Sequence, residues 1–372
     1  MNWNYAQPVP ILFGNGRIKE LGEEVRKLKK KKGLLITSRS FVKRGIALEI
    51  LKESEGLLAA VYGEISPNPD ITECQACVDL LKEMNCDFVV ALGGGSVLDC
   101  AKAAAAIATA DLPVSAYLEG EPVPSESLSL IAVPTTAGTG SEVTSVAVLS
   151  DHAKGLKKPL AGASLYPTLA LVDPELTITM PPFTTACTGM DAFCHSLEAY
   201  WNIHHQPICD ALAVYALKLI LQNIRTAYRE PENREAREKM AEASLIAGLA
   251  FTIPKTTAPH ACSYPLTSMF DIAHGEACAL TLDWFLRLNA KEDREGRLQR
   301  LAEELGFRDC EAFAEEIAAL KKDLGLRRDL KDLGINEETF EKLVQGSTSS
   351  NLCNNPVTVT DEHLRQLYRS LL

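Results

Sequence analysis

The feature that most constrains this chain is a strand pattern that ends in glycines and continues as a helix. The apolar run Asp87-Phe-Val-Val-Ala-Leu92 stops at Gly93-Gly-Gly-Ser96, and Val97–Thr109 then has the composition of an apolar helix. Glycines let a backbone approach a ligand closely, and the free N–H groups of a helix N-terminus suit a phosphate. Because the segment is neither GxGxxG nor Walker A, a plain tight turn is the alternative.

The same alternation recurs through the first half of the chain. Strand patterns at 33–37, 58–62 and 128–133 alternate with helical spacing at 41–53 and 71–84. This rhythm predicts a parallel sheet with helices on both faces. Further strand character at 142–150 and 169–172 is compatible with a hairpin.

The pattern changes after Asp173-Pro174. β-Branched runs nearly disappear, and helical patterns follow at 191–200, 210–227, 234–249 and 311–324. Prolines between 174 and 182 mark the boundary. We therefore predict an α/β domain over residues 1–178 and an all-helical domain over residues 179–372.

A second glycine-rich loop strengthens the case for a bound ligand. Pro134-Thr-Thr-Ala-Gly-Thr-Gly-Ser-Glu142 follows a predicted strand and is dense in hydroxyl groups. Open α/β sheets bind ligands at the carboxyl ends of their strands, so two such loops belong to one edge. Together they favour a dinucleotide over a plain turn.

Four residues of the second half have side chains that suit a metal ion. Asp191 and His195 are four residues apart on a predicted helix, which places a carboxylate and an imidazole on one face. His260 and His274 follow later, and three imidazoles with one carboxylate suit Fe²⁺ or Zn²⁺. Spacing alone does not establish that the distant histidines meet the helical pair.

Charge and cysteine usage exclude several classes of protein. The net charge is −11, from 38 Lys and Arg against 49 Asp and Glu, which disfavours binding to nucleic acid or an anionic membrane. We find no apolar run of membrane-spanning length and no secretory signal. The 11 cysteines form no disulfide framework, and Cys74 and Cys77 are interpreted as buried helical thiols. We expect a cytoplasmic protein.

These motifs together resemble the iron-containing, or group III, alcohol dehydrogenases. The resemblance runs through most of the chain and rests on Pro67-Asn-Pro69, 87–102, 134–144, Asp173-Pro-Glu175, 188–192 with His195, and His274-Gly275. It implies an N-terminal dinucleotide-binding α/β domain and an all-helical C-terminal domain, an architecture shared with dehydroquinate synthase. It also implies an active site in the cleft, a homodimer, and Fe²⁺, or alternatively Zn²⁺, held by Asp191, His195, His260 and His274.

The resemblance also implies the residues of a cofactor groove. Gly94, Gly95 and Ser96 would hold the pyrophosphate, and the rest of the groove would be lined by Asn68, Asp99, Thr135, Thr136, Thr139 and Lys157. Many members carry an acidic residue after the first strand that selects NAD. Here Ser38 stands at that position beside Arg39, so NADPH is admissible as well as NADH.

A second departure from the family pattern concerns the substrate. Tyr264 stands where many members have a further histidine, and Lys255, Thr256 and Thr257 directly precede His260. This segment resembles the branch of phosphonoacetaldehyde reductases, whose substrate needs a cation and hydroxyl donors near the metal. Lys255 is then the cation, unless it is simply a solvated surface lysine.

The expected reaction is reduction of phosphonoacetaldehyde to 2-hydroxyethylphosphonate. The metal would polarise the carbonyl, the nicotinamide would deliver hydride, and Tyr264 or a water would supply a proton. Three other functions stay open at this point. They are reduction of short aliphatic aldehydes or oxidation of diols, a lyase reaction on the dehydroquinate synthase architecture, and cofactor binding without catalysis.

Overall fold

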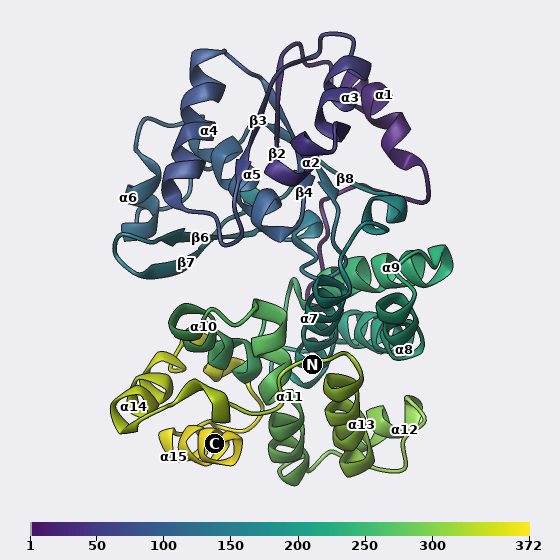
Figure 1. The fold of residues 1–372 in the computed structure, drawn as a ribbon, viewed down its shortest axis with the longest axis vertical. Helices are drawn as coiled ribbons and strands as arrows, with labels where there is room; N and C mark the ends of the chain where they lie inside the picture. Colours follow the sequence, from purple (N-terminus) through teal and green to yellow (C-terminus); the bar gives the residue numbers. More distant parts are fainter. Residues whose placement is uncertain (1) are drawn as a thin grey trace. The chain divides into compact units, whose positions relative to one another are not determined.

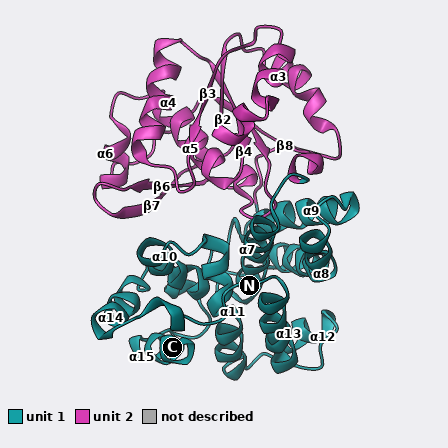
Figure 2. Cartoon of the chain, in the orientation of Figure 1, with its two compact units in different colours: residues 1–5, 178–372 teal, residues 6–177 magenta. Residues whose placement is uncertain are grey.

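A computed structural model of the chain describes residues 2–372 and contains two compact units. One is Ala6–Thr177, and the other joins the residues before Ala6 to Ile178–Leu372, as Figure 2 shows in magenta and teal. The first unit is an α/β domain and the second is all-helical (Figure 1). The predicted fold class is thereby confirmed.

The α/β unit is built on a six-stranded parallel sheet in the order β1-β8-β5-β4-β2-β3. A separate antiparallel hairpin joins β6 and β7. The strands are β1 (Ile11–Phe13), β2 (Gly33–Ser38), β3 (Leu58–Ile65), β4 (Phe88–Gly93), β5 (Ser129–Pro134), β6 (Val146–Asp151), β7 (Leu156–Ala161) and β8 (Leu169–Val172).

The helices of this unit cover both faces of the sheet. Along β4, Val89 and Ala91 pack into one apolar cluster, whereas Phe88, Val90 and Leu92 pack into the cluster on the other face. Burial on both faces explains why these strands read as continuous apolar runs. The helices are α1 (Leu21–Lys27), α2 (Arg39–Lys43), α3 (Ile46–Glu53), α4 (Ile71–Glu83), α5 (Gly95–Ile107) and α6 (Val114–Glu119), with the 3-10 helices η1 (Arg17–Glu20), η2 (Ser141–Val143), η3 (Ala163–Leu165) and η4 (Pro174–Thr177).

The local expectations are met, with informative differences. The helix predicted at 41–53 is broken at Gly45, whose φ of 80° interrupts the helical path between α2 and α3. The hairpin character near 142–150 is real, but its second strand is β7, which the sequence pattern did not reveal. β8 instead joins the main sheet in parallel. Cys74 and Cys77 are buried on α4, as interpreted.

The helical unit packs around α7. Most of this helix is buried, and it lies against α8, α9 and α11 (Figure 1). The helices are α7 (Pro182–Trp201), α8 (Pro207–Arg229), α9 (Arg234–Phe251), α10 (Ala258–Phe270), α11 (His274–Lys291), α12 (Arg297–Glu304), α13 (Cys310–Asp323), α14 (Glu337–Gly346) and α15 (Asp361–Leu371), with the 3-10 helices η5 (Lys331–Leu333) and η6 (Ser350–Asn354).

One helix bears on the expectation that no apolar run has membrane-spanning length, although charged residues interrupt it. By length and mean hydropathy alone, α8 is long and apolar enough to cross a bilayer. The same test is passed by core helices of water-exposed domains, and α8 packs along both α7 and α9. Its apolar character is therefore accounted for by helix packing.

Candidate functional site

The glycine loop after β4 lies against the hydroxyl-rich loop after β5. A Cβ at Gly94 would lie 3.1 Å from Cγ2 of Thr136, and one at Gly95 would lie 2.6 Å from Cγ2 of Thr139. The backbone N–H of Thr135 donates to the carbonyl of Gly93 at 3.0 Å. Glycine is thus required by close packing here, and the residues that lead into α5, Gly93–Gly95, carry no side chain.

Three of the predicted cofactor residues form one hydrogen-bonded group beside this loop. The backbone N–H of Asn68 donates to Oγ of Ser96 at 3.2 Å, and Nζ of Lys157 donates to Oδ1 of Asn68 at 2.8 Å. Asn68 has a φ of 53°, in the left-handed region that asparagine tolerates. The structure therefore brings together the loop after β3, the first turn of α5 and the hairpin strand β7.

Asp99 faces the chain's own donors. Its Oδ1 accepts a hydrogen bond from Oγ of Ser141 at 2.6 Å, and its Oδ2 accepts one from the N–H of Val148 at 2.9 Å. Nζ of the fully buried Lys102 lies 3.7 Å from Oδ1. These contacts hold the loop that follows β5 onto α5.

Ser38 and Arg39 lie at the carboxyl end of β2. Oγ of Ser38 lies 3.0 Å from Oγ of Ser40, and Nε of Arg39 forms an ion pair with Glu64, which lies in β3. The sequence did not indicate this carboxylate, because Glu64 is 25 residues away. The charge of Arg39 is therefore partly balanced from the neighbouring strand.

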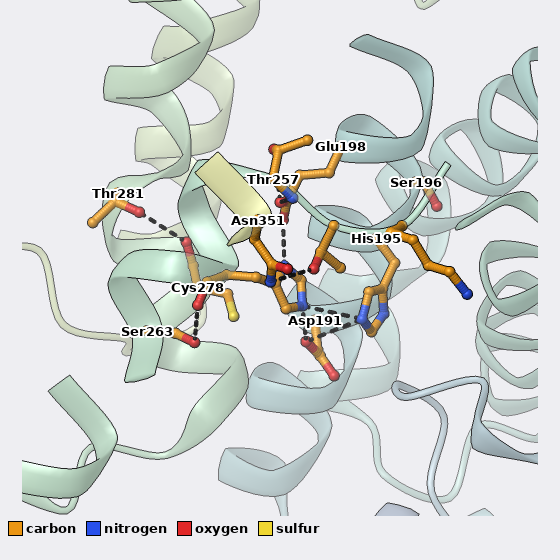
Figure 3. A network of polar contacts seen from close by, with 12 residues as sticks. Asp191, His195, Ser196, Glu198, Thr257, Ser263, Cys278, Thr281 and Asn351 are labelled. Atoms are coloured by element: carbon orange, nitrogen blue, oxygen red, sulfur yellow. Dashed lines mark hydrogen bonds and ion pairs between the residues drawn. The ribbon is translucent and has the colours of Figure 1, made fainter. Parts of the chain in front are cut away.

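The four predicted metal residues converge in the helical unit, where Figure 3 labels Asp191 and His195. Oδ1 of Asp191 lies 3.5 Å from Nε2 of His260, 3.8 Å from Nε2 of His274 and 4.0 Å from Nε2 of His195. The Nε2 atoms of His195 and His260 are 3.1 Å apart. Helices α7, α10 and α11 thus aim one oxygen and three ring nitrogens at a common point.

Backbone packing explains how α11 comes so close to α7. A Cβ at Gly275 would lie 2.0 Å from the carbonyl oxygen of Cys187 and 3.0 Å from Cβ of Asp191. Any side chain at Gly275 would push His274 away from the carboxylate. The His-Gly pair is therefore a steric requirement of the cluster.

Hydrogen bonds to Nδ1 determine which ring nitrogen carries the proton in His260 and His274. Oε1 of Glu198 accepts from Nδ1 of His260, while Oε2 accepts from the N–H and the hydroxyl of Thr257 at 2.6 and 2.8 Å. Oγ of Ser263 donates to the carbonyl of His260 and so faces Nδ1 of His274, 3.3 Å away, as an acceptor. In their neutral forms both rings then carry the proton on Nδ1 and leave Nε2 free for a metal ion.

The carboxylate at the centre shows that these residues fit a divalent cation. Oδ1 of Asp191 is buried and has no hydrogen-bond partner among residues 2–372. Burial opposes its ionisation, yet positive charge on the rings of His195, His260 and His274 holds the pKa of Asp191 below its ordinary value when no metal ion is bound. An unsatisfied buried anion among ring nitrogens is stabilised by a cation, and the set of one oxygen and three nitrogens suits Fe²⁺ or Zn²⁺.

The segment before α10 is held in an unusual conformation. Lys255 has a φ of 71°, its N–H donates to the carbonyl of Phe251 at 2.8 Å, and its carbonyl accepts from Nδ2 of Asn202 at 3.1 Å. Its side chain is exposed. Left-handed conformations of lysine are strained and recur at functional sites.

A residue from η6 ties this segment to α10. Nδ2 of Asn351 donates to Oγ1 of Thr256 and to the hydroxyl of Tyr264, each at 3.0 Å. Burial raises the pKa of Tyr264, although His260 and Asn351 oppose this effect. Tyr264 is four residues beyond His260 on α10, so the predicted tyrosine lies one helical turn from a metal residue.

Three participants were missed or undervalued in the sequence. Ser263 and Asn351 carry no motif that marks them. Cys278 joins Asp191, His260 and His274 in a group of donor atoms that lie within 4.8 Å of one another. The spacing of His274 and Cys278, four residues apart on one helix, is the signal that the sequence offered.

Comparison with known proteins identifies relatives over the whole chain. The model of the iron-containing alcohol dehydrogenase family matches residues 8–174, and its C-terminal counterpart matches residues 185–372. NAD-dependent methanol dehydrogenase of Bacillus methanolicus is 32% identical over 99% of this chain and 100% of that protein. 1,3-Propanediol dehydrogenase of Citrobacter freundii is 32% identical over 99% of this chain and 98% of that one.

A solved structure is more similar still. Sulfoacetaldehyde reductase from Bifidobacterium kashiwanohense, in complex with NAD⁺, has a TM-score of 0.97 and 47% identity, covering 100% of this chain and 99% of the other. Similarity of both halves, with converging metal residues in the second, supports alcohol or aldehyde oxidoreductase activity. The chain belongs to the iron-containing alcohol dehydrogenase family.

Proposed function

We propose that this protein reduces a two-carbon aldehyde with an anionic tetrahedral head, either sulfonate or phosphonate, to the primary alcohol. The observation that carries the proposal is the group around Thr256, in which Asn351 donates to the hydroxyls of Thr256 and Tyr264 and the exposed Lys255 precedes Thr256 in the chain. Sulfoacetaldehyde, named for the 47%-identical neighbour, has this form. Phosphonoacetaldehyde, expected from the sequence, has the same length and a more highly charged head.

The hydrogen bonds of Asn351 determine what the two hydroxyls can do. Because Nδ2 donates to both Thr256 and Tyr264, each hydroxyl oxygen acts as an acceptor there. The hydroxyl hydrogen of each is then free to donate elsewhere. No described residue pairs with the ammonium of Lys255, so its charge is available to an anion. Lys255 and Thr256 are proposed to hold the head of the substrate.

The chemistry would take place at the cluster around Asp191. When bound, the metal supplies a Lewis acid and the nicotinamide supplies a hydride. Asp191, His195, His260 and His274 are proposed to hold the metal, with Glu198 and Ser263 fixing two of the rings. Tyr264, kept protonated by its raised pKa, is proposed to give its hydroxyl proton to the product oxygen and to regain one from water.

NADH is the proposed reductant, bound by the loop at Gly94–Ser96 and the group formed by Asn68 and Lys157. The ion pair between Arg39 and Glu64 weakens the case for NADPH, because Glu64 brings a negative charge beside the arginine that would have to meet a 2′-phosphate. NADPH is tested alongside NADH in the assays below.

The test compares aldehydes of one shape and different charge. The metal-loaded enzyme is assayed with sulfoacetaldehyde, phosphonoacetaldehyde and 3,3-dimethylbutanal, in which a tert-butyl group replaces the anionic head. We expect kcat/KM to favour one anionic aldehyde at least about 100-fold over the neutral one, which equals about 2.7 kcal/mol. Equal rates, or faster turnover of the neutral aldehyde, would overturn the proposal.

The head-binding role is tested with paired lysine variants. Lys255→Ala should raise KM for the anionic aldehyde about tenfold or more and leave 3,3-dimethylbutanal unaffected. Lys291→Ala removes an exposed lysine from the same unit and serves as the control. Equal losses on charged and neutral substrates would show that Lys255 does not recognise the anion.

A second candidate function has its own support. The methanol and 1,3-propanediol dehydrogenases match nearly the whole chain at 32% identity. If the neutral aldehyde is the better substrate, the protein is a general short-chain alcohol, aldehyde or diol dehydrogenase. Assays of butanal and 1,3-propanediol in the same series identify that outcome.

A further inference from the structure

A buried thiol lies among the proposed metal-binding atoms. Sγ of Cys278 is 3.8 Å from Nε2 of His274 and belongs to the group of donor atoms that also includes Asp191 and His260. In Figure 3, Cys278 extends from its helix toward the same region as Asp191. Its side chain is fully buried, so whatever interacts with the thiol must also lie inside the protein.

The helix geometry of the thiol repeats that of an accepted pair. His274 and Cys278 are four residues apart on α11, as Asp191 and His195 are on α7. Side chains at this spacing share one face of a helix. Two helices thus each present two donor side chains to one region.

The unpartnered carboxylate provides an independent observation. Oδ1 of Asp191 is buried, lacks a hydrogen bond and lies in the same donor group as the sulfur. A buried carboxylate oxygen without a hydrogen bond is costly unless a cation lies next to it. A cation bound there lies close to the sulfur as well.

We propose that Cys278 gives its sulfur to the metal as a thiolate, so that the centre combines nitrogen, oxygen and sulfur donors. Metal binding displaces the thiol proton to solvent, and no electron is transferred. A thiolate is a soft ligand that favours Zn²⁺ or Co²⁺ over harder ions such as Mn²⁺. This assignment does not depend on which aldehyde the enzyme reduces.

The test is the absorption spectrum of the Co²⁺-loaded protein. Sulfur bound to Co²⁺ gives an ultraviolet charge-transfer band that nitrogen and oxygen ligands do not give. We expect this band in the wild-type protein and its loss in Cys278→Ser, which keeps the visible bands of bound Co²⁺. Cys262→Ser replaces another fully buried thiol, one that faces Tyr368 and Ser347, and should keep the band.

A metal-affinity measurement gives a second readout. Cys278→Ser should weaken Zn²⁺ binding about tenfold or more in chelator competition and change Mn²⁺ binding much less. A wild-type spectrum without the sulfur band, or an unchanged band in Cys278→Ser, would overturn the proposal.

If the variant fails to fold, X-ray absorption spectroscopy of the Zn²⁺-loaded wild-type protein decides whether sulfur is bound to the metal. A sulfur atom at about 2.3 Å from zinc would support the proposal, and a shell of nitrogen and oxygen alone would refute it.

Discussion

The loop that follows β4 and the cluster around Asp191 differ in what makes each a candidate site. At Gly94 and Gly95 the important property is that side chains are missing, because Thr136 and Thr139 pack where a Cβ would lie. Around Asp191 the important property is that side chains from three helices converge. The first is set by local chain geometry, whereas the second depends on packing between helices.

This contrast predicts that a substitution in one unit leaves ligand binding by the other unit unchanged. Variants of the helical unit should change metal binding and leave NADH binding intact. Variants of the α/β unit should change stability or cofactor choice and leave metal content intact. The four predictions below test this separation, from the largest expected effect to the smallest.

Asp191→Asn removes the charge at the centre of the cluster. We expect the purified variant to lose its metal and its kcat/KM to fall at least about 10³-fold, because a bound Lewis acid contributes several kcal/mol to such a reaction. Metal analysis and NADH oxidation measure the two effects. NADH binding, followed by fluorescence in the same variant, should be unchanged, and a variant that keeps metal and turnover would contradict the assignment.

Glu142 makes the stability of the α/β unit depend on pH. Burial raises the pKa of Glu142 to about 7, although its own backbone N–H and Lys102 oppose this effect. The folded state therefore holds the proton more tightly than the unfolded state. Its stabilising contribution is complete below the unfolded pKa of about 4.5 and is lost as the pH rises through about 7.

Glu142→Gln should remove that dependence. Between pH 4.5 and 8 the wild-type protein should lose up to about 3 kcal/mol of unfolding free energy relative to this variant. Urea unfolding at both pH values measures the difference, and Glu126→Gln, at an exposed carboxyl in the same unit, is the control. If the free energy of unfolding depends on pH in the same way for wild type and Glu142→Gln, burial does not raise the pKa of Glu142.

Glu198→Gln tests whether hydrogen bonds around the cluster orient its ligands. The oxygen of glutamine can still accept from both Thr257 groups, but its –NH₂ group then faces Nδ1 of His260 and cannot accept the proton of that ring. We expect metal affinity to fall 10- to 100-fold. Glu276→Gln is the matched control, because its carboxylate pairs with the backbone N–H of Arg327 and with no imidazole.

The smallest effect concerns the choice between the two cofactors. Glu64→Gln releases Arg39 and should raise the ratio of NADPH to NADH activity a few-fold, since exposed ion pairs contribute at most about 1 kcal/mol. Steady-state kinetics with both cofactors measure the ratio, and Glu49→Gln is an exposed control in the same unit. A lower ratio in Glu64→Gln would mean that Arg39 does not approach the 2′ position.

Several features of the fold were predictable because they are local. The apolar run that forms β4, the glycines after it and the helical spacing of Asp191 and His195 depend on residues close together in the chain. The split between α2 and α3 at Gly45 and the strand β7 were missed. A single glycine reads as tolerable within a helix, and Leu156–Ala161 is mostly exposed and carries two lysines.

The sequence by itself determined the two-part architecture, the glycine loop after β4 and the four metal-ligand candidates, because side-chain periodicity and glycine chemistry operate within a few residues. Only the tertiary structure decided which distant groups meet. It placed Cys278 near Asp191 and His260, Ser263 against the ring of His274, and the amide of Asn351 between Thr256 and Tyr264. These contacts arise from helix packing, for which no short-range pattern in the chain encodes the partner.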